Sequence, residues 1–169
     1  MKNKIKIVLT GGGSGGHVFP LIAVTREIKR LLPQDTKLTY VVPKDEWTRL
    51  YLSQEEVKIK NTLAGKMRRY LGVEAIFLNI LDVFKIFLGL IQSLFILIAT
   101  NPDIIFSKGG YGSIPPCLAG KMLGIPIFSH ESDAVPGLAN RFISKLSVQT
   151  FTSFPKTEYL DPKKTIRVG

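Results

Sequence analysis

Short apolar runs rich in β-branched residues recur along the chain and alternate with segments of helical period. Runs of this kind are typical of strands, and strands that alternate with helices are typical of parallel βαβ units. The predicted strands are residues 5–9, 38–42, 104–106, 125–128 and 148–151, and residues 165–169 resemble a strand that leads out of the domain. The pattern therefore predicts an α/β fold with a Rossmann-like, doubly wound parallel sheet.

Two of the intervening segments carry helix signals, although the helical period of the first is only partly clean. Residues 18–32 place most of their apolar side chains on one side, and Pro33 ends the pattern. Pro20 falls in the predicted first turn, where its missing N–H does no harm. Residues 113–123 predict a second, short helix, with two prolines near its start and Gly124 as its C-terminal stop.

The most apolar segment, residues 76–99, follows a basic one. Asn79, Asp82, Lys85 and Gln92 interrupt its apolar residues too often for a good membrane span, so we expect one long helix or two, partly buried. A basic and apolar combination suits an anionic membrane surface, although an ordinary core helix with solvated lysines has the same pattern. We expect a mixture, in which residues 90–97 pack inward and earlier ones reach the membrane. The predicted membrane contacts are Lys66, Arg68, Arg69, Ile76, Phe77, Ile80 and Phe84.

Composition narrows the possible classes of protein. With 169 residues, 45% of them hydrophobic and 21% charged, the chain predicts one folded domain over residues 1–169. A single cysteine, Cys117, and two histidines exclude a disulfide framework and a zinc site of the usual kind, and favour a reducing compartment. The net charge of +10 predicts attraction to anions, but no nucleic-acid module pattern is present.

The segment Gly11-Gly12-Gly13-Ser14-Gly15-Gly16-His17 joins the first predicted strand to the first helix. Its glycines fit G-x-G-x-x-G, in which backbone N–H groups approach a diphosphate, but no acid closes the second strand as nicotinamide binding requires. A P-loop needs Lys and Ser or Thr at the positions of His17 and Val18. The segment also fits G-x-S-x-G, but an esterase elbow needs an acid and then a histidine downstream in a suitable fold, and we do not find them. A glycine turn without a ligand is the remaining alternative.

Two further loops follow predicted strands: Ser107-Lys108-Gly109-Gly110-Tyr111-Gly112-Ser113 and Ser129-His130-Glu131-Ser132-Asp133. In an open parallel sheet all three loops emerge at the carboxyl ends of strands, where such sheets bind ligands. Their convergence is stronger evidence for a binding site than any single loop.

Three segments together resemble the signatures of the MurG family, the GT-B glycosyltransferases of bacterial peptidoglycan assembly in glycosyltransferase family 28. They are GGGSGGHVFP at residues 11–20, GGYGS at residues 109–113 and HESDAVPGLANR at residues 130–141. The resemblance covers essentially the whole chain as the N-terminal, acceptor-binding domain, with the C-terminal donor-binding domain absent from this chain. It implies inverting transfer of N-acetylglucosamine from UDP-N-acetylglucosamine to undecaprenyl-diphosphate-muramyl-pentapeptide, by a peripheral enzyme at the cytoplasmic face of the bacterial cell membrane.

The resemblance also implies roles for individual residues. Ser14, Gly15 and Gly16 would contact the acceptor diphosphate, and His17 would be the catalytic base or oxyanion partner, or would simply fix the loop. The other acceptor-binding residues implied are Tyr111, Glu131 and Asn140, and further ligand contacts are Gly13, Gly110, Ser113, His130 and Arg141.

The sequence departs from the family at Ser132 and Asp133, where the family commonly has Gln and Asn. A carboxylate in place of a neutral amide would repel a diphosphate, so this position is expected to alter ligand chemistry. We expect no cofactor and no dedicated metal site, since no carboxylate pair resembles a Mg²⁺ site.

Two other functions compete with the acceptor-binding half of a glycosyltransferase. One is a membrane-associated, acceptor-recruiting subunit of a split transferase, inactive alone; the isolated chain is expected to be inactive in either case. The other is a dinucleotide-dependent oxidoreductase, which the missing acid after the second strand disfavours.

Overall fold

Seven parallel strands form one sheet in the order β3-β2-β1-β4-β5-β6-β7. The computed structural model describes residues 4–66 and 73–168, and the side chains of residues 73–75 are not described. The strands are β1 (Ile5–Gly11), β2 (Thr36–Pro43), β3 (Lys58–Thr62), β4 (Ile104–Gly109), β5 (Ile127–Glu131), β6 (Gln149–Thr152) and β7 (Thr165–Arg167). The predicted α/β class and doubly wound parallel sheet are confirmed.

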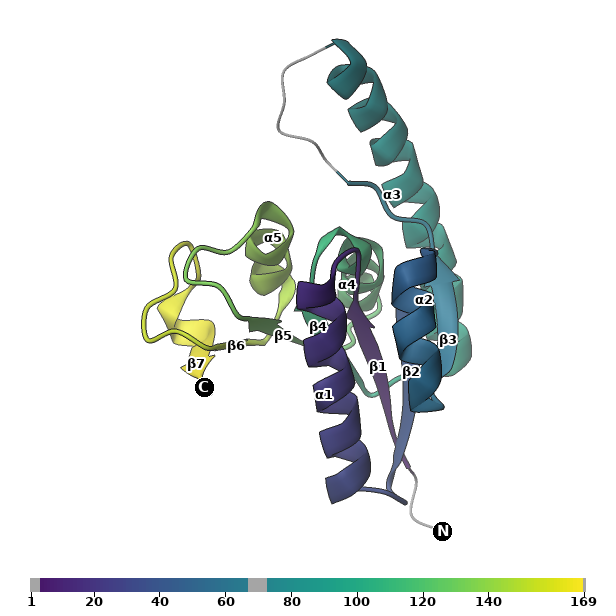
Figure 1. Cartoon of the computed structure of the whole chain (residues 1–169), viewed down its shortest axis with the longest axis vertical. Helices are drawn as coiled ribbons and strands as arrows, with labels where there is room; N and C mark the ends of the chain where they lie inside the picture. The colour runs from purple at the N-terminus through teal and green to yellow at the C-terminus, as the bar shows by residue number, and fades with distance from the viewer. Residues whose placement is uncertain (1–3, 67–72, 169) are drawn as a thin grey trace.

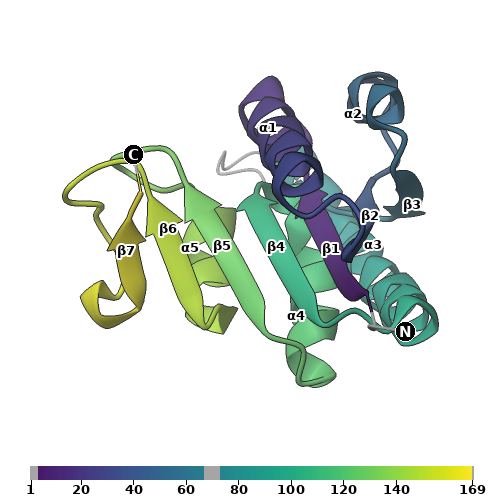
Figure 2. The ribbon, with the colours of Figure 1, turned by 90° about the horizontal axis from the view of Figure 1, so that it is seen from below.

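Helices cover both faces of the sheet (Figure 2). They are α1 (Gly15–Leu31), α2 (Glu46–Leu52), α3 (Val73–Thr100), α4 (Ile114–Met122) and α5 (Leu138–Leu146), with short 3₁₀ turns η1 (Ser53–Glu55), η2 (Tyr111–Ser113) and η3 (Pro162–Lys164). The α1 and α2 side holds one apolar core, around Leu9, Leu21 and Tyr40. The opposite core, around Leu97 and Ile105, lies under α3, α4 and α5.

Several boundaries differ from the prediction in ways that matter for the site. The fourth and fifth strands continue further than their apolar runs, so Lys108, His130 and Glu131 are strand residues rather than loop residues. Helix α1 begins at Gly15, which places His17 in its first turn and Pro20 in its second, not in the first as predicted. The candidate site residues Lys108, His130, Glu131 and His17 therefore lie on strands and a helix rather than on loops.

One strand and two helices were not predicted. Strand β3 alternates charged and apolar residues, and α2 and α5 are short helices, so their patterns are weak. The strand predicted at the C-terminal end is present as β7, and it pairs with β6 at the edge of the sheet, with Thr165 opposite Thr150. Periodicity cannot show which strand a short segment will pair with.

Helix α3 is a single helix whose inner side mixes polar and apolar residues and whose outer side is strongly apolar. Its buried positions include Asp82, Gly89 and Ser93, whereas the phenylalanines Phe84 and Phe95 are exposed. The predicted inward packing of its C-terminal half is confirmed for four residues, Leu90, Leu94, Ile96 and Leu97. Figure 1 shows the N-terminal half of α3 projecting beyond the sheet.

The polar residues of α3 hold the segment that follows β3. The Gln92 side-chain oxygen accepts a 2.8 Å hydrogen bond from the Leu63 N–H. A Cβ at Gly89 would overlap the Leu63 carbonyl, and a Cβ at Gly65 would overlap the Asp82 carbonyl. Gln92, one of the polar interruptions, and the close approach at Gly89 therefore hold residues 63–65 against the helix.

We expected Asn79, Asp82, Lys85 and Gln92 to make this segment too polar for a membrane span. Judged by length and composition alone, that expectation is wrong. Ile76–Thr100 is long and apolar enough to cross a membrane, and little of it is buried. Since one face of α3 packs on the sheet and on α4, the helix is nonetheless an integral layer of this domain.

The close approach at Gly89 gives a stability prediction. Gly89→Ala should lower the free energy of unfolding by about 1–3 kcal/mol, although alanine favours helices, because the added Cβ forces the Leu63 segment away. Chemical denaturation of the two proteins measures this difference. Gly137→Ala is the matched control, since a Cβ there meets nothing within 4 Å, and an equal loss in both variants would contradict the packing argument.

Candidate functional site

The three loops singled out in the sequence meet at the carboxyl edge of the sheet, as predicted. Strands β1 and β4 are neighbours, and Gly11 lies opposite Gly109 at their ends. The chain leaves β1 toward α1 on one face and leaves β4 toward α4 on the other (Figure 2). This is the topological switch point, where open α/β sheets bind ligands.

The first glycine loop has backbone conformations that require glycine. Gly12 and Gly13 have positive φ angles of 138° and 87°, and a Cβ on Gly13 would overlap the Tyr111 ring. Ser14 is exposed at the N-cap of α1, and its side chain makes no cap hydrogen bond. The loop therefore presents a hydroxyl and a helix N-terminus beside a cavity of about 220 Å³, a combination that suits an anion.

His17 is held by the second glycine loop. Its Nδ1 lies 3.3 Å from the carbonyl oxygen of Lys108, and because a carbonyl only accepts, Nδ1 carries the proton. The Nε2 lone pair is then left for another partner. Burial and, next, the Lys108 charge lower the pKa of His17, so the ring is neutral near pH 7 and able to accept a proton.

The second glycine loop is fixed by the third signature segment. The Asn140 side chain accepts a 2.9 Å bond from the Gly110 N–H and donates a 2.7 Å bond to Glu131 Oε2. Glu131 is buried, and its Oε1 accepts from the Asp133 N–H. Glu131 and Asn140 thus position the loop, and their direct contact with a ligand stays a prediction.

Lys108 is the functional candidate that sequence reasoning missed. Only 1% of it is exposed, and its Nζ donates a 3.1 Å bond to Ser132 Oγ. Burial lowers the pKa of Lys108, while the Glu131 and Asp133 carboxylates oppose that shift. The signal in the sequence was a lysine directly after an apolar strand, which we assigned to the loop.

This lysine bears on the departure from the family pattern at residues 132 and 133. Asp133 adds a negative charge, and Ser132 supplies the oxygen that Lys108 binds. The ammonium offsets part of the carboxylate charge, so the repulsion of an anionic ligand expected from Asp133 is reduced.

The other predicted contacts occupy different surroundings. Ser113 is fully buried behind the loop, and its hydroxyl donates to the Gly109 carbonyl. His130 is half-buried, and its pKa is lowered by burial and by Lys108. Arg141 donates to the Pro136 carbonyl and stacks on the Tyr159 ring at 3.4 Å, so it braces the C-terminal segment.

The surroundings of the first loop contain a second unpredicted feature. Phe19, Trp47 and Tyr51 form an aromatic cluster, with ring centroids 4.5–5.8 Å apart, and Trp47 lines the same cavity as Ser14. Asp45, the acid nearest the end of β2, caps α2 by accepting from the Thr48 N–H. It thereby stabilises the start of that helix, and it also lines the cavity of Ser14.

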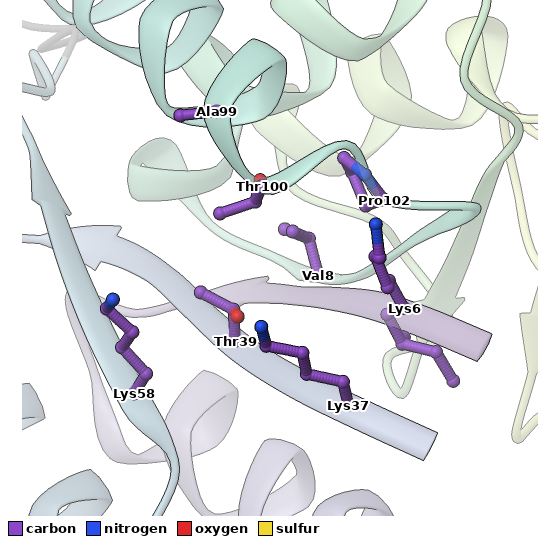
Figure 3. Close-up of a pocket in the computed structure, with 9 residues that line it drawn as sticks. Lys6, Val8, Lys37, Thr39, Lys58, Ala99, Thr100 and Pro102 are labelled. Carbon is purple, nitrogen blue, oxygen red and sulfur yellow. The ribbon is translucent and has the colours of Figure 1, made fainter. Parts of the chain in front are cut away.

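A separate, basic cavity of about 180 Å³ lies at the opposite edge of the sheet. Figure 3 shows Lys6, Lys37 and Lys58 reaching toward the end of α3 at Thr100. The last turn of α3 has no basic residue of its own, and these lysines line the cavity beside it. Within residues 4–66 and 73–168, no group of three or more metal-ligating side chains is found.

The sequence profile of the glycosyltransferase family 28 N-terminal domain matches residues 7–152. The chain belongs to glycosyltransferase family 28. Two curated relatives carry the name UDP-N-acetylglucosamine--N-acetylmuramyl-(pentapeptide) pyrophosphoryl-undecaprenol N-acetylglucosamine transferase. The one from Clostridium kluyveri is 38% identical over 90% of this chain and 41% of its own length, and the one from Streptococcus pyogenes serotype M49 is 41% identical over 94% and 43%.

Solved structures agree with the family 28 assignment at the level of the fold. MurG from Acinetobacter baumannii superposes with a TM-score of 0.79 at 22% identity, over 97% of this chain and 45% of that one. A UDP-GlcNAc 2-epimerase from Neisseria meningitidis superposes with a TM-score of 0.64 at 18% identity, over 98% of this chain and 46% of the epimerase chain. The chain spans less than half the length of these relatives and structures.

The charge of Lys108 gives a prediction for His17. Lys108→Met should raise the pKa of His17, because the variant removes a nearby positive charge while leaving the ring in its place. An NMR titration of the His17 ring measures the change. Lys121→Met, at an exposed position on α4, is the control and should leave the His17 pKa unaltered; an unchanged or lower pKa in the Lys108 variant would contradict the assignment.

Proposed function

We propose that this chain is the acceptor-binding half of an inverting N-acetylglucosaminyltransferase of peptidoglycan synthesis. The observation that carries the proposal is the pair of glycine loops at the switch point, with a neutral histidine between them. The names of the curated relatives supply the substrate class: a muramyl-pentapeptide joined through a diphosphate to undecaprenol, and UDP-N-acetylglucosamine as donor. The donor is bound mainly by a second, C-terminal domain, and residues 1–169 are one domain.

In this proposal the acceptor diphosphate lies beside Ser14, Gly15 and Gly16. The N-terminus of α1 and the Ser14 hydroxyl donate to its oxygens, and Lys108 adds positive charge below the loop. Gly13 and Gly110 allow this approach because each has positive φ and no space for a Cβ. Tyr111 packs over Gly13 and limits the cavity on the other side.

His17 is the catalytic base. Its Nε2 takes the proton of the attacking sugar hydroxyl as the oxygen forms a bond to the anomeric carbon, and UDP leaves from the opposite side with inversion. The Nδ1 bond to the Lys108 carbonyl holds the ring in the tautomer that this step needs. A neutral ring is available near pH 7 because burial and Lys108 lower its pKa.

We also propose peripheral binding to an anionic membrane, at the cytoplasmic face of the bacterial cell membrane. Support comes from the exposed side chains of Ile76, Phe77, Ile80 and Phe84, which are 52–62% accessible on the projecting half of α3. Lys66 is exposed near this half, whereas Arg68 and Arg69 lie outside the described residues. Because the C-terminal half of α3 packs on the domain, we infer that the projecting half lies on the membrane and that the helix does not cross it.

The proposal predicts selective binding of the acceptor. A short-chain lipid-linked muramyl pentapeptide should bind this chain, and UDP-N-acetylglucosamine should bind at least tenfold more weakly, as measured by calorimetry. His17→Ala should change acceptor affinity by no more than a few fold, because the histidine acts on the reacting hydroxyl.

Gly13→Ala should abolish acceptor binding through its overlap with Tyr111, and Gly137→Ala should not. Donor binding without acceptor binding would reverse the assignment.

Membrane binding gives a separate prediction. The double variant Ile80→Ser and Phe84→Ser should reduce co-sedimentation with vesicles that contain anionic lipid by at least tenfold, because each buried side chain contributes about 1.5–3 kcal/mol. Leu31→Ser, at an equally exposed position on α1, is the control. Equal binding by all three proteins would show that this part of α3 is not the membrane contact.

A further inference from the structure

A second cavity adjoins the first glycine loop and differs from it in chemistry. It has a volume of about 380 Å³ and lies between three helices. Its walls include Ile86 from α3, Ile114 and Leu118 from α4, and Leu138 and Phe142 from α5. The lining is almost entirely aliphatic and aromatic, so the cavity suits an apolar ligand rather than a sugar or a phosphate.

Tyr111 is a wall of both cavities. On one side it lines the cavity of Gly13, Ser14 and Gly15, and on the other it lines the apolar cavity. The ring is in contact with Gly13 and lies between the polar cavity and the apolar one. A ligand bound across Tyr111 needs a charged part joined directly to an apolar part.

The walls of the apolar cavity are preformed. Gly65 lines it, and the segment that contains Gly65 is held against α3 by the Gln92 bond and by close packing at Gly89. The rim is accessible, since Leu138 is 55% and Phe142 40% exposed. A ligand can therefore enter without unfolding a helix, and apolar groups that enter lose contact with water.

We propose that this cavity binds the first isoprene units of the acceptor's prenyl chain, next to its diphosphate. The inference rests on the proposed function, which places the diphosphate in the adjoining glycine loop. The prenyl chain begins at that diphosphate, so its first units are the apolar groups that can lie across Tyr111. The cavity thus recognises the carrier lipid itself, in addition to the general membrane contact of α3.

The test compares acceptor analogues that differ only in the alkyl group on the diphosphate. Muramyl-pentapeptide diphosphates that carry a methyl, a five-carbon prenyl or a ten-carbon prenyl group are titrated into the chain by calorimetry, without vesicles or detergent. We expect the dissociation constant to fall at least tenfold from the methyl to the ten-carbon compound, because each methylene that enters the cavity leaves water.

Two variants that fill the cavity locate the effect. Ala139→Phe on α5 and Leu118→Trp on α4 each place a larger ring at a lining position. Both variants should bind the methyl compound as tightly as the unmodified chain does, which also shows that they fold. In both, affinity should no longer rise with the length of the prenyl group. Ala23→Phe, at an exposed position on α1, is the matched control and should retain the gain.

The outcomes separate this inference from the proposed function. If the methyl compound binds but affinity does not rise with chain length, or if both filled variants keep the rise, the prenyl site is wrong and the acceptor assignment stands. If no compound with the muramyl headgroup binds, the acceptor assignment fails and the prenyl site fails with it.

Discussion

Close approach of two glycine loops at the β1–β4 switch point is the constraint on which the candidate site depends. A Cβ at Gly110 would press on the Gly12 carbonyl and the His17 ring, and one at Gly109 would overlap the Asn140 side chain. Pro43, at the end of β2, fills the remaining space and would meet a Cβ on Gly12 or Gly112. The backbone comes this close only because side chains are absent, and the tight packing in turn holds His17 against the Lys108 carbonyl.

The charged groups of the candidate site surround one buried lysine, Lys108. Lys108 lies close enough to His17 to lower its pKa, and its ammonium is held by Ser132 next to two carboxylates. A buried cation is costly unless it is paired, and the pairing here is made by residues of the third signature segment. The residues at positions 132 and 133, where the sequence departs from the usual family residues, therefore act on the charge of this lysine.

Helix α3 connects the site to the membrane proposal through its two sides. Gln92 and the close packing at Gly89 hold residues 63–65, of which Gly65 lines the apolar cavity, and the apolar residues turned outward make a long exposed stripe. One helix thereby serves as a wall of the cavity and as the outer surface of the domain. Gln92, which interrupts its apolar pattern, has a packing role.

Local patterns in the sequence determined the parallel α/β class, the three loops at one edge of the sheet and the basic segment before an apolar helix. These features follow from short-range periodicity and glycine spacing, which act within a few residues. The burial of Lys108, the tautomer of His17, the pairing of β7 and the buried polar residues of α3 were decided only by the tertiary structure. Each depends on contacts between distant residues, such as the 91 positions that separate His17 from Lys108, and neither burial nor local charge is defined before those contacts form.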